Sequence, residues 1–204
     1  CTGLPANAVW NSATIEQEWN GTMWAPIATG THTTGSATDR CYFKCIDEGT
    51  KFDWVDNACT GHTNSNVACD NNSLPANASW WNANINQTWN GTEWLPTTAG
   101  SYSDAAIANL CRFHCDAHFN WNGSTCSAET NIATCEGKPA NAEWNSASSI
   151  TQHWDGEKFI PSTIASYGET PTTEECRFKC KENYTVSDDQ KYCVPAERNA
   201  NCTG

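Results

Sequence analysis

The fold is decided by residues 85–96, which read I-N-Q-T-W-N-G-T-E-W-L-P. The same pattern occurs at 15–26 as I-E-Q-E-W-N-G-T-M-W-A-P and at 150–161 as I-T-Q-H-W-D-G-E-K-F-I-P. Asn-Gly or Asp-Gly between alternating segments is the strongest short-range indicator of a β-hairpin. A proline, which has no backbone N–H, ends the second strand of each copy. We therefore predict three similar hairpins.

The turn chemistry predicts a register within each hairpin. A two-residue type I′ turn requires positive φ at both central residues, which are here the Asn (or Asp) and the Gly. Alternation places Ile15, Gln17 and Trp19 on one face, and this turn brings Trp24 opposite Gln17. Because no stretch has helical periodicity, we expect an all-β fold.

The 13 cysteines divide the chain into tandem repeats. Sets of four begin at Cys1, Cys69 and Cys135, and a P-A-N-A motif follows each opening cysteine. Steps of 68, 66 and 67 residues lead from one set to the next and then to Cys202, so each module has about 67 residues. The predicted domains are three disulfide-stapled β modules, each with one hairpin, at 1–68, 69–134 and 135–201, and the start of a fourth repeat at 202–204.

Composition indicates what holds these modules together. Leu, Ile, Val and Phe make up only about 12% of the chain, whereas 11 Trp and 13 Cys are present. Indole rings and disulfides must supply the core, which places the chain in an oxidising, extracellular compartment. The cysteines predicted to form disulfides are Cys1, Cys41, Cys45, Cys59, Cys69, Cys111, Cys115, Cys126, Cys135, Cys176, Cys180, Cys193 and Cys202.

Two disulfide connectivities are compatible with the strand pattern. Each module contains C-x-F-x-C, and on a strand the Phe and both cysteines share the inner face. Residues four apart on a strand are separated by about 13 Å, beyond the roughly 7 Å limit for a disulfide, so Cys41 does not pair with Cys45. We favour first with second and third with fourth, because the hairpin between the last two closes easily. First with third and second with fourth is the alternative.

Stretches rich in Thr, Ser, Gly and Ala follow the hairpins, at 28–39, 97–108 and 162–175. They offer little apolar surface to bury, so we predict exposed loops or extended connectors.

Sequons for N-glycosylation are more frequent than chance predicts, and several fall in predicted turns. A glycan at Asn20 or Asn90 would project beside the hairpin tryptophans. The candidate sugar-stacking residues are Trp19, Trp24, Trp89 and Trp94. The predicted glycosylation sites are Asn20, Asn71, Asn77, Asn86, Asn90, Asn122, Asn183 and Asn201.

Charge and hydropathy exclude several classes of partner. The net charge of -12 and the pI near 4.6 argue against nucleic acid, which binds clustered Lys and Arg. No apolar run approaches the roughly 18 residues of a membrane helix, so we expect no membrane span.

The sequence also lacks the marks of an enzyme. No G-x-S-x-G, H-E-x-x-H or Gly-rich phosphate loop occurs, so we predict no catalytic residue and no enzyme activity. We expect no metal site at His114 and His118, because a disulfide claims Cys115 between them. No cofactor is expected beyond covalent glycans. Calcium has candidate ligands without a recognised spacing, and these are Asp53, Asp56, Asp188 and Asp189.

The openings C-T-G-L-P-A-N-A-V-W-N (1–11) and C-D-N-N-S-L-P-A-N-A-S-W-W-N (69–82) and the closing F-N-W-N-G-S-T-C (119–126) carry a resemblance. They resemble cysteine-rich tandem-repeat modules of very large secreted or surface proteins of uncultured bacteria. The resemblance implies a secreted or surface-attached, many-times-repeated, fibrous architecture, and it transfers no catalytic residue. The third module departs from the pattern at Lys138, where the others have Leu4 and Leu74.

Together these features predict a structural extracellular protein that forms a glycan-coated surface filament, stalk or fibre. Its expected partners are further copies of itself or of the same repeat array, and glycans. A carbohydrate-binding adhesin or lectin that uses the Trp hairpins is the alternative. An accessory module of a secreted hydrolase is a second alternative.

Overall fold

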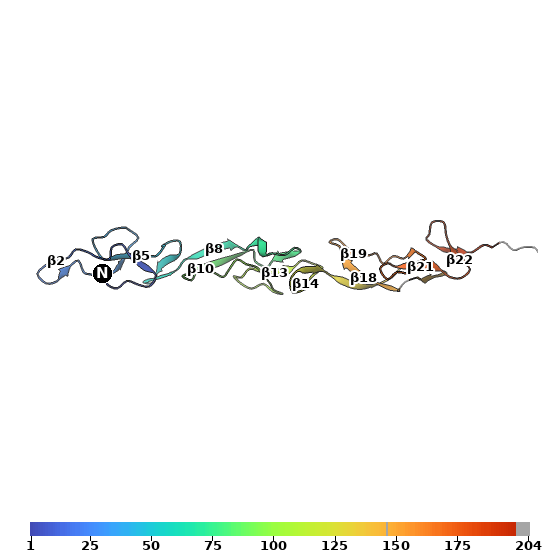
Figure 1. The fold of residues 1–204 in the computed structure, drawn as a ribbon, viewed down its shortest axis with the longest axis horizontal. Coiled ribbons are helices and arrows are strands. Elements are labelled where there is room, and N and C mark those ends of the chain that lie inside the picture. The colour runs from blue at the N-terminus through green and yellow to red at the C-terminus, as the bar shows by residue number, and fades with distance from the viewer. Residues whose placement is uncertain (146, 199–204) are drawn as a thin grey trace, which may run out of the picture. The chain divides into compact units, whose positions relative to one another are not determined.

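The computed structural model of the chain describes residues 1–145 and 147–198. Within them, every regular element is a β-strand except one short 3-10 helix, η1 (Asn71–Ser73), so the all-β prediction is confirmed (Figure 1). None of the described helices is long and apolar enough to cross a membrane. The predictions for Asn201, Cys202 and the fourth repeat at 202–204 lie outside the described residues.

The strands follow the order of the sequence repeats. Repeat one holds β1 (Ala8–Trp10), β2 (Glu18–Trp19), β3 (Trp24–Ala25), β4 (Thr31–His32), β5 (Tyr42–Cys45), β6 (Phe52–Val55), β7 (Ala58–Gly61) and β8 (Thr63–Ala68). Repeat two holds β9 (Ala78–Trp80), β10 (Asn84–Trp89), β11 (Trp94–Leu95), β12 (Ser101–Tyr102), β13 (Arg112–Cys115), β14 (Phe119–Trp121), β15 (Cys126–Ala128) and β16 (Thr130–Thr134). Repeat three holds β17 (Ala142–Trp144), β18 (Ser149–Trp154), β19 (Phe159–Ile160), β20 (Ser166–Tyr167), β21 (Arg177–Cys180), β22 (Tyr184–Val186) and β23 (Cys193–Pro195).

The chain divides into two compact units. One unit comprises Cys1–Leu74 with Ser79–His114, and the other comprises Pro75–Ala78 with Cys115–Gly204. The boundary therefore falls inside the second sequence repeat, and the division into three modules stays a prediction.

The strand that carries C-x-F-x-C is the centre of a small sheet in each repeat. The sheet orders are β1-β5-β4, β12-β13-β9 and β17-β21-β20. In repeat one, β1 pairs antiparallel with β5, and β4 pairs parallel with it through Thr31 and Tyr42. The stretches that follow the hairpins, which we predicted to be exposed loops or extended connectors, each contain a two-residue strand near their start.

The inner face of this sheet forms the core of the repeat. Cys41, Phe43 and Cys45 are all buried, as the alternation predicts. The Trp10 ring meets the Phe43 ring edge-on at 5.9 Å. A Cβ atom at Gly30 would lie 2.7 Å from Trp10, so only glycine fits beneath this indole.

Six disulfides link the described cysteines in one repeated connectivity. The first cysteine of each set joins the second, and the third joins the fourth, with Cα atoms 5.4 to 5.6 Å apart. This is the pairing favoured by the closure of the last hairpin. The bonds are Cys1–Cys41, Cys45–Cys59, Cys69–Cys111, Cys115–Cys126, Cys135–Cys176 and Cys180–Cys193.

The Asn-Gly hairpins form, but the predicted turn type and register are wrong. Trp19 pairs with Trp24, not Gln17 with Trp24, so four residues separate the paired positions. Only the glycine, with φ +92 at Gly21, has positive φ. A two-residue turn with positive φ at both centres occurs elsewhere, at Asp56 and Asn57 between β6 and β7. Those residue types tolerate the left-handed region through their short polar side chains.

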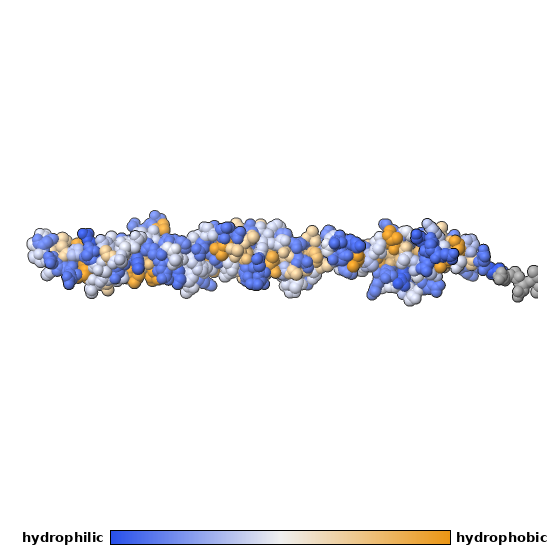
Figure 2. Space-filling model, turned by 90° about the horizontal axis from the view of Figure 1, so that it is seen from above, coloured by the Kyte–Doolittle hydropathy of each residue, from blue (hydrophilic) through white to orange (hydrophobic). Residues whose placement is uncertain are grey.

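Apolar side chains form small separate groups on the surface. Figure 2 shows orange residues interrupted by blue and white ones on the visible face. This pattern agrees with a protein whose buried residues are mostly cysteine and phenylalanine.

Candidate functional site

The hairpin turns are closed by one side chain used in the same way four times. The side-chain oxygen of Asn20 accepts hydrogen bonds from the backbone N–H groups of Thr22 and Met23, at 3.0 and 2.9 Å. This local acceptor explains the observed turn, because it satisfies two backbone N–H groups inside the turn. Asn90, Asn122 and Asp155 make the equivalent pairs of bonds.

A glutamine holds the far end of each hairpin. Gln17, Gln87 and Gln152 donate from Nε2 to the carbonyl oxygens of Pro26, Pro96 and Pro161 at 2.6 to 2.7 Å. The preceding peptide bond is cis at all three prolines. Sequence reasoning missed this contact, although a Gln nine residues before a Pro in all three copies was a visible signal.

The second hairpin gains a third strand from the preceding repeat. The linker strand β8 runs antiparallel to β10, with Val67 opposite Ile85 (Figure 1). The backbone N–H of Trp89 donates a hydrogen bond to the backbone carbonyl of His62 at 3.0 Å. A bulge interrupts the ladder between Ile85 and Gln87. We call this combination of a hairpin and the preceding linker strand a hairpin junction.

The third hairpin has the same junction. The linker strand β16 pairs with β18 along its full length, from Thr130 opposite His153 to Thr134 opposite Ser149. The Trp154 N–H donates to the carbonyl of Glu129 at 3.0 Å. We did not predict either linker pairing, since the partner strand lies some twenty residues away in the sequence.

A histidine packs at each of these two junctions. His62 Nδ1 forms a hydrogen bond with Asp53 Oδ2 at 2.7 Å. The His62 ring centroid lies 6.3 Å from the Trp94 ring centroid. His118 makes the matching contact with Glu129 at 2.9 Å. Its ring centroid lies 4.1 Å from that of Trp154. The histidines occupy different positions in their repeats, which is why the sequence did not reveal the shared role.

The four predicted sugar-stacking tryptophans fall into two groups. Trp19 and Trp24 are 56% and 59% exposed, whereas Trp89 and Trp94 are half-buried at the second junction. The Lys51 ammonium lies 5.2 Å from the Trp89 ring and covers part of it. Trp19 and Trp24 meet at an interplanar angle of 67°, so both rings cannot lie flat on one sugar.

All seven described sequon asparagines are exposed, but their amide nitrogens differ. The glycosidic bond forms at Nδ2. In Asn122 this nitrogen donates to Thr125 Oγ1 and Ser127 Oγ at 3.1 and 2.7 Å. In Asn20 and Asn90 the hydrogen bonds of the side chain are at Oδ1. The described sites are Asn20, Asn71, Asn77, Asn86, Asn90, Asn122 and Asn183.

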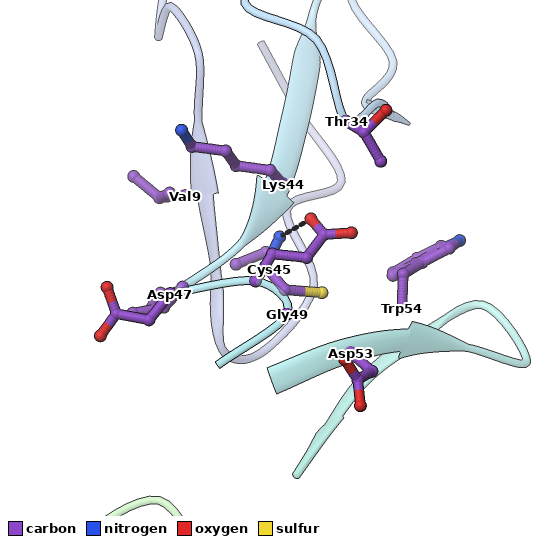
Figure 3. Close-up of a pocket in the computed structure, with 11 residues that line it drawn as sticks. Val9, Thr34, Lys44, Cys45, Asp47, Gly49, Asp53 and Trp54 are labelled. Carbon is purple, nitrogen blue, oxygen red and sulfur yellow. Dashed lines mark hydrogen bonds between the residues drawn. The ribbon is translucent and has the colours of Figure 1, made fainter. Parts of the chain in front are cut away.

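A hollow of about 1070 Å³ lies in repeat one (Figure 3). Glu48 is one of its lining residues, and its carboxylate accepts a hydrogen bond from the Cys45 backbone N–H at 3.0 Å and contacts His32 Nε2 at 3.0 Å. The His32 ring stacks on Trp54 at 4.6 Å. Cys45 is bonded to Cys59, so it offers no thiolate to a metal. Glu48 therefore serves to anchor the loop after β5.

The calcium candidates are engaged in local structure. Asp53 contacts His62, and Asp56 lies in the two-residue turn. Asp189 accepts from Ser187 Oγ at 2.7 Å and from the Lys191 N–H at 3.1 Å. Asp53 and Asp56 belong to one compact unit, and Asp188 and Asp189 belong to the other.

Four groups have perturbed pKa values, each through a hydrogen bond. The pKa of Asp155 is lowered by the N–H groups of Glu157 and Lys158, which stabilise the carboxylate. The pKa of Asp189 is lowered by the Ser187 hydroxyl. The pKa values of Tyr102 and Tyr167 are raised, because their hydroxyls donate to Asp104 and Glu169.

Comparisons with protein families, curated proteins and solved structures find no match to the chain. The geometry of the junctions is therefore the basis for a functional conclusion.

Proposed function

We propose that the chain is a structural segment of an extracellular repeat array that forms a glycan-coated surface filament, stalk or fibre. One observation carries the proposal. At both junctions the linker strand of one repeat completes the hairpin sheet of the next, so that folded structure continues from repeat to repeat. Arrays in which each unit contacts its neighbours grow by repetition, without a central core.

The disulfides and sequons support the extracellular setting. Six disulfides enclose most of each repeat, which suits an oxidising compartment. The exposed sequons offer attachment points for a glycan coat.

Antibodies raised against the folded chain test this proposal on intact source cells. We expect labelling without permeabilisation and a mass that falls on deglycosylation. Labelling that requires permeabilisation, together with reduced cysteines in the isolated protein, would contradict it.

Carbohydrate binding is the second candidate, favoured by the exposure of Trp19 and Trp24. A glycan array separates the two functions. A structural array gives no selective binding, whereas a lectin binds defined glycans and loses them on Trp19→Ala and Trp24→Ala. Phe159→Ala, at the half-buried third hairpin, is the control.

A further inference from the structure

The first hairpin lacks the third strand that the other two have. β2 contains only Glu18 and Trp19, whereas the equivalent strands β10 and β18 have six residues each. In the described part of the chain, β2 pairs with β3 alone. The opposite edge, formed by residues 13–19, therefore stays open, and open strand edges are templates for a further strand.

Burial follows this difference. Ile85 and Ile150, on the strands that pair with a linker strand, are 2% exposed, but the equivalent Ile15 is only half-buried. Gln87 and Gln152 are buried as well, whereas Gln17 is exposed. The first hairpin thus has the apolar and hydrogen-bonding residues of a junction, but no linker strand pairs with it in the described part of the chain.

The start of the open edge is already in position. At the two complete junctions the N–H groups of Cys69 and Cys135 donate to the carbonyls of Ala83 and Ser148, both at 2.9 Å. The amino group of Cys1 donates to the equivalent carbonyl of Ala13 at 3.3 Å. A strand that ends at Cys1 would therefore enter the same register as β8 and β16.

We propose that the edge 13–19 is a docking site for one linker strand of the type found in this chain, supplied by a repeat joined directly to Cys1. The occupant is an extended segment like T-N-S-N-V-A (63–68) or T-N-I-A-T (130–134), mostly polar, with one apolar residue such as Val67 or Ala133 opposite the hairpin isoleucine. The hydrogen bond from the Cys1 nitrogen to the Ala13 carbonyl favours a strand that continues covalently into Cys1, because this bond sets the register of such a strand. The inference rests on the proposed array function.

The matching donor in repeat one is the backbone N–H of Trp19, by analogy with the backbone N–H groups of Trp89 and Trp154. The docked strand would accept from this group, as the carbonyls of His62 and Glu129 do at the other junctions. It would also cover Ile15 and part of the exposed Trp19 ring.

The test adds the nine residues T-G-H-T-N-S-N-V-A (60–68) in front of Cys1 of the full chain. The matched control adds the same residues in scrambled order. Amide hydrogen exchange is followed at 14–19, with 84–89 and 149–154 as internal references. We expect protection at 14–19 to rise by about ten-fold or more with the native extension only. The Trp fluorescence should shift to shorter wavelength.

Three outcomes would overturn the proposal. They are equal protection with native and scrambled extensions, no gain with either, or protection of 14–19 in the unextended chain that grows with concentration. The last result, supported by sedimentation, would assign the edge to a second copy. The test does not depend on cell-surface location. The docking inference can therefore fail while the proposed function stands, and the proposed function can fail while the docking inference stands.

Discussion

Gln87 donates from Nε2 to the carbonyl oxygen of Pro96 at 2.7 Å, and the glutamine is 8% exposed. The same contact in repeat one, from Gln17 to Pro26, is exposed to solvent. The chain therefore offers a buried and an exposed form of one hydrogen bond.

Replacing Gln87 by alanine should lower the free energy of unfolding by about 1–3 kcal/mol, because the Pro96 carbonyl loses its partner in a buried setting. Gln17→Ala is the control and should cost less than about 1 kcal/mol, since water replaces the lost donor. Denaturant unfolding of both variants measures the difference. Equal losses would show that burial does not matter at this contact.

Gly61→Ala should disrupt the second junction. A Cβ atom at Gly61 would lie 1.8 Å from the carbonyl oxygen of Trp89, so the backbones must move apart. We expect a loss of about 1–3 kcal/mol, as for other overpacked sites, and faster hydrogen exchange at 63–68. Gly35→Ala meets only Thr33 Oγ1 at 3.4 Å and should be neutral by both measures.

The long disulfide loops should contribute more than the short ones. Removing Cys69–Cys111, which spans 42 residues, should cost about 4 kcal/mol if loop entropy dominates. Removing Cys115–Cys126, which spans 11, should cost about 3 kcal/mol. Paired Cys→Ala variants compared by thermal unfolding give the order. A larger loss for the short loop would instead indicate a packing contribution of its sulfur atoms.

Glycan occupancy should differ among the turn sequons. Asn20 and Asn90 should be occupied more fully than Asn122, if attachment follows folding, because Asn122 Nδ2 is held by two hydroxyls. Glycopeptide mass spectrometry of the natural protein measures this. The substitution Ser127→Ala frees one of those bonds and should raise occupancy at Asn122. Higher occupancy at Asn122 than at Asn20 would contradict the argument.

The third hairpin should weaken in acid. The folded pKa of Asp155 is lowered by the N–H groups of Glu157 and Lys158. Its contribution is therefore present above the unfolded pKa of about 3.9 and is lost as the pH falls through the lower folded value. Chemical shifts of 155–158 followed from pH 6 to pH 2 report this change. Asp155→Asn keeps the acceptor and should remove the pH dependence; an unchanged titration would exclude Asp155 as its source.

The predictable parts of the fold are those with a local chemical signature. Alternation around Asn-Gly is enough to predict the hairpin, and the spacing of cysteines favours the connectivity that the structure has. The predicted turn type was wrong because the Asn20 side chain accepts hydrogen bonds from two backbone N–H groups, which stabilises a longer turn. Sequence rules for Asn-Gly do not include this competing bond.

The parts that could not be predicted depend on distant pairing. β4 has two residues, which is too short for any periodicity, and its parallel partner β5 follows after nine residues of loop. The linker strand β8 reads T-N-S-N-V-A, without alternation of apolar and polar residues, and nothing local identifies β10 as its partner. Of the predicted stacking residues, Trp89 and Trp94 are half-buried at the second junction. Sequence alone does not separate them from Trp19 and Trp24.

The connectivity of the disulfides also determines how the chain responds to tension. Force entering at Cys1 crosses through sulfur to Cys41, so the residues between them bear none of it. The Cys45–Cys59 bond removes the next loop from the path in the same way. What remains to stretch in repeat one is the step from Cys41 to Cys45 and the linker up to Cys69. Fully extended, that linker reaches only about 35 Å. Each repeat can therefore lengthen only a little while its disulfides are intact, and the linker strands determine how far it extends.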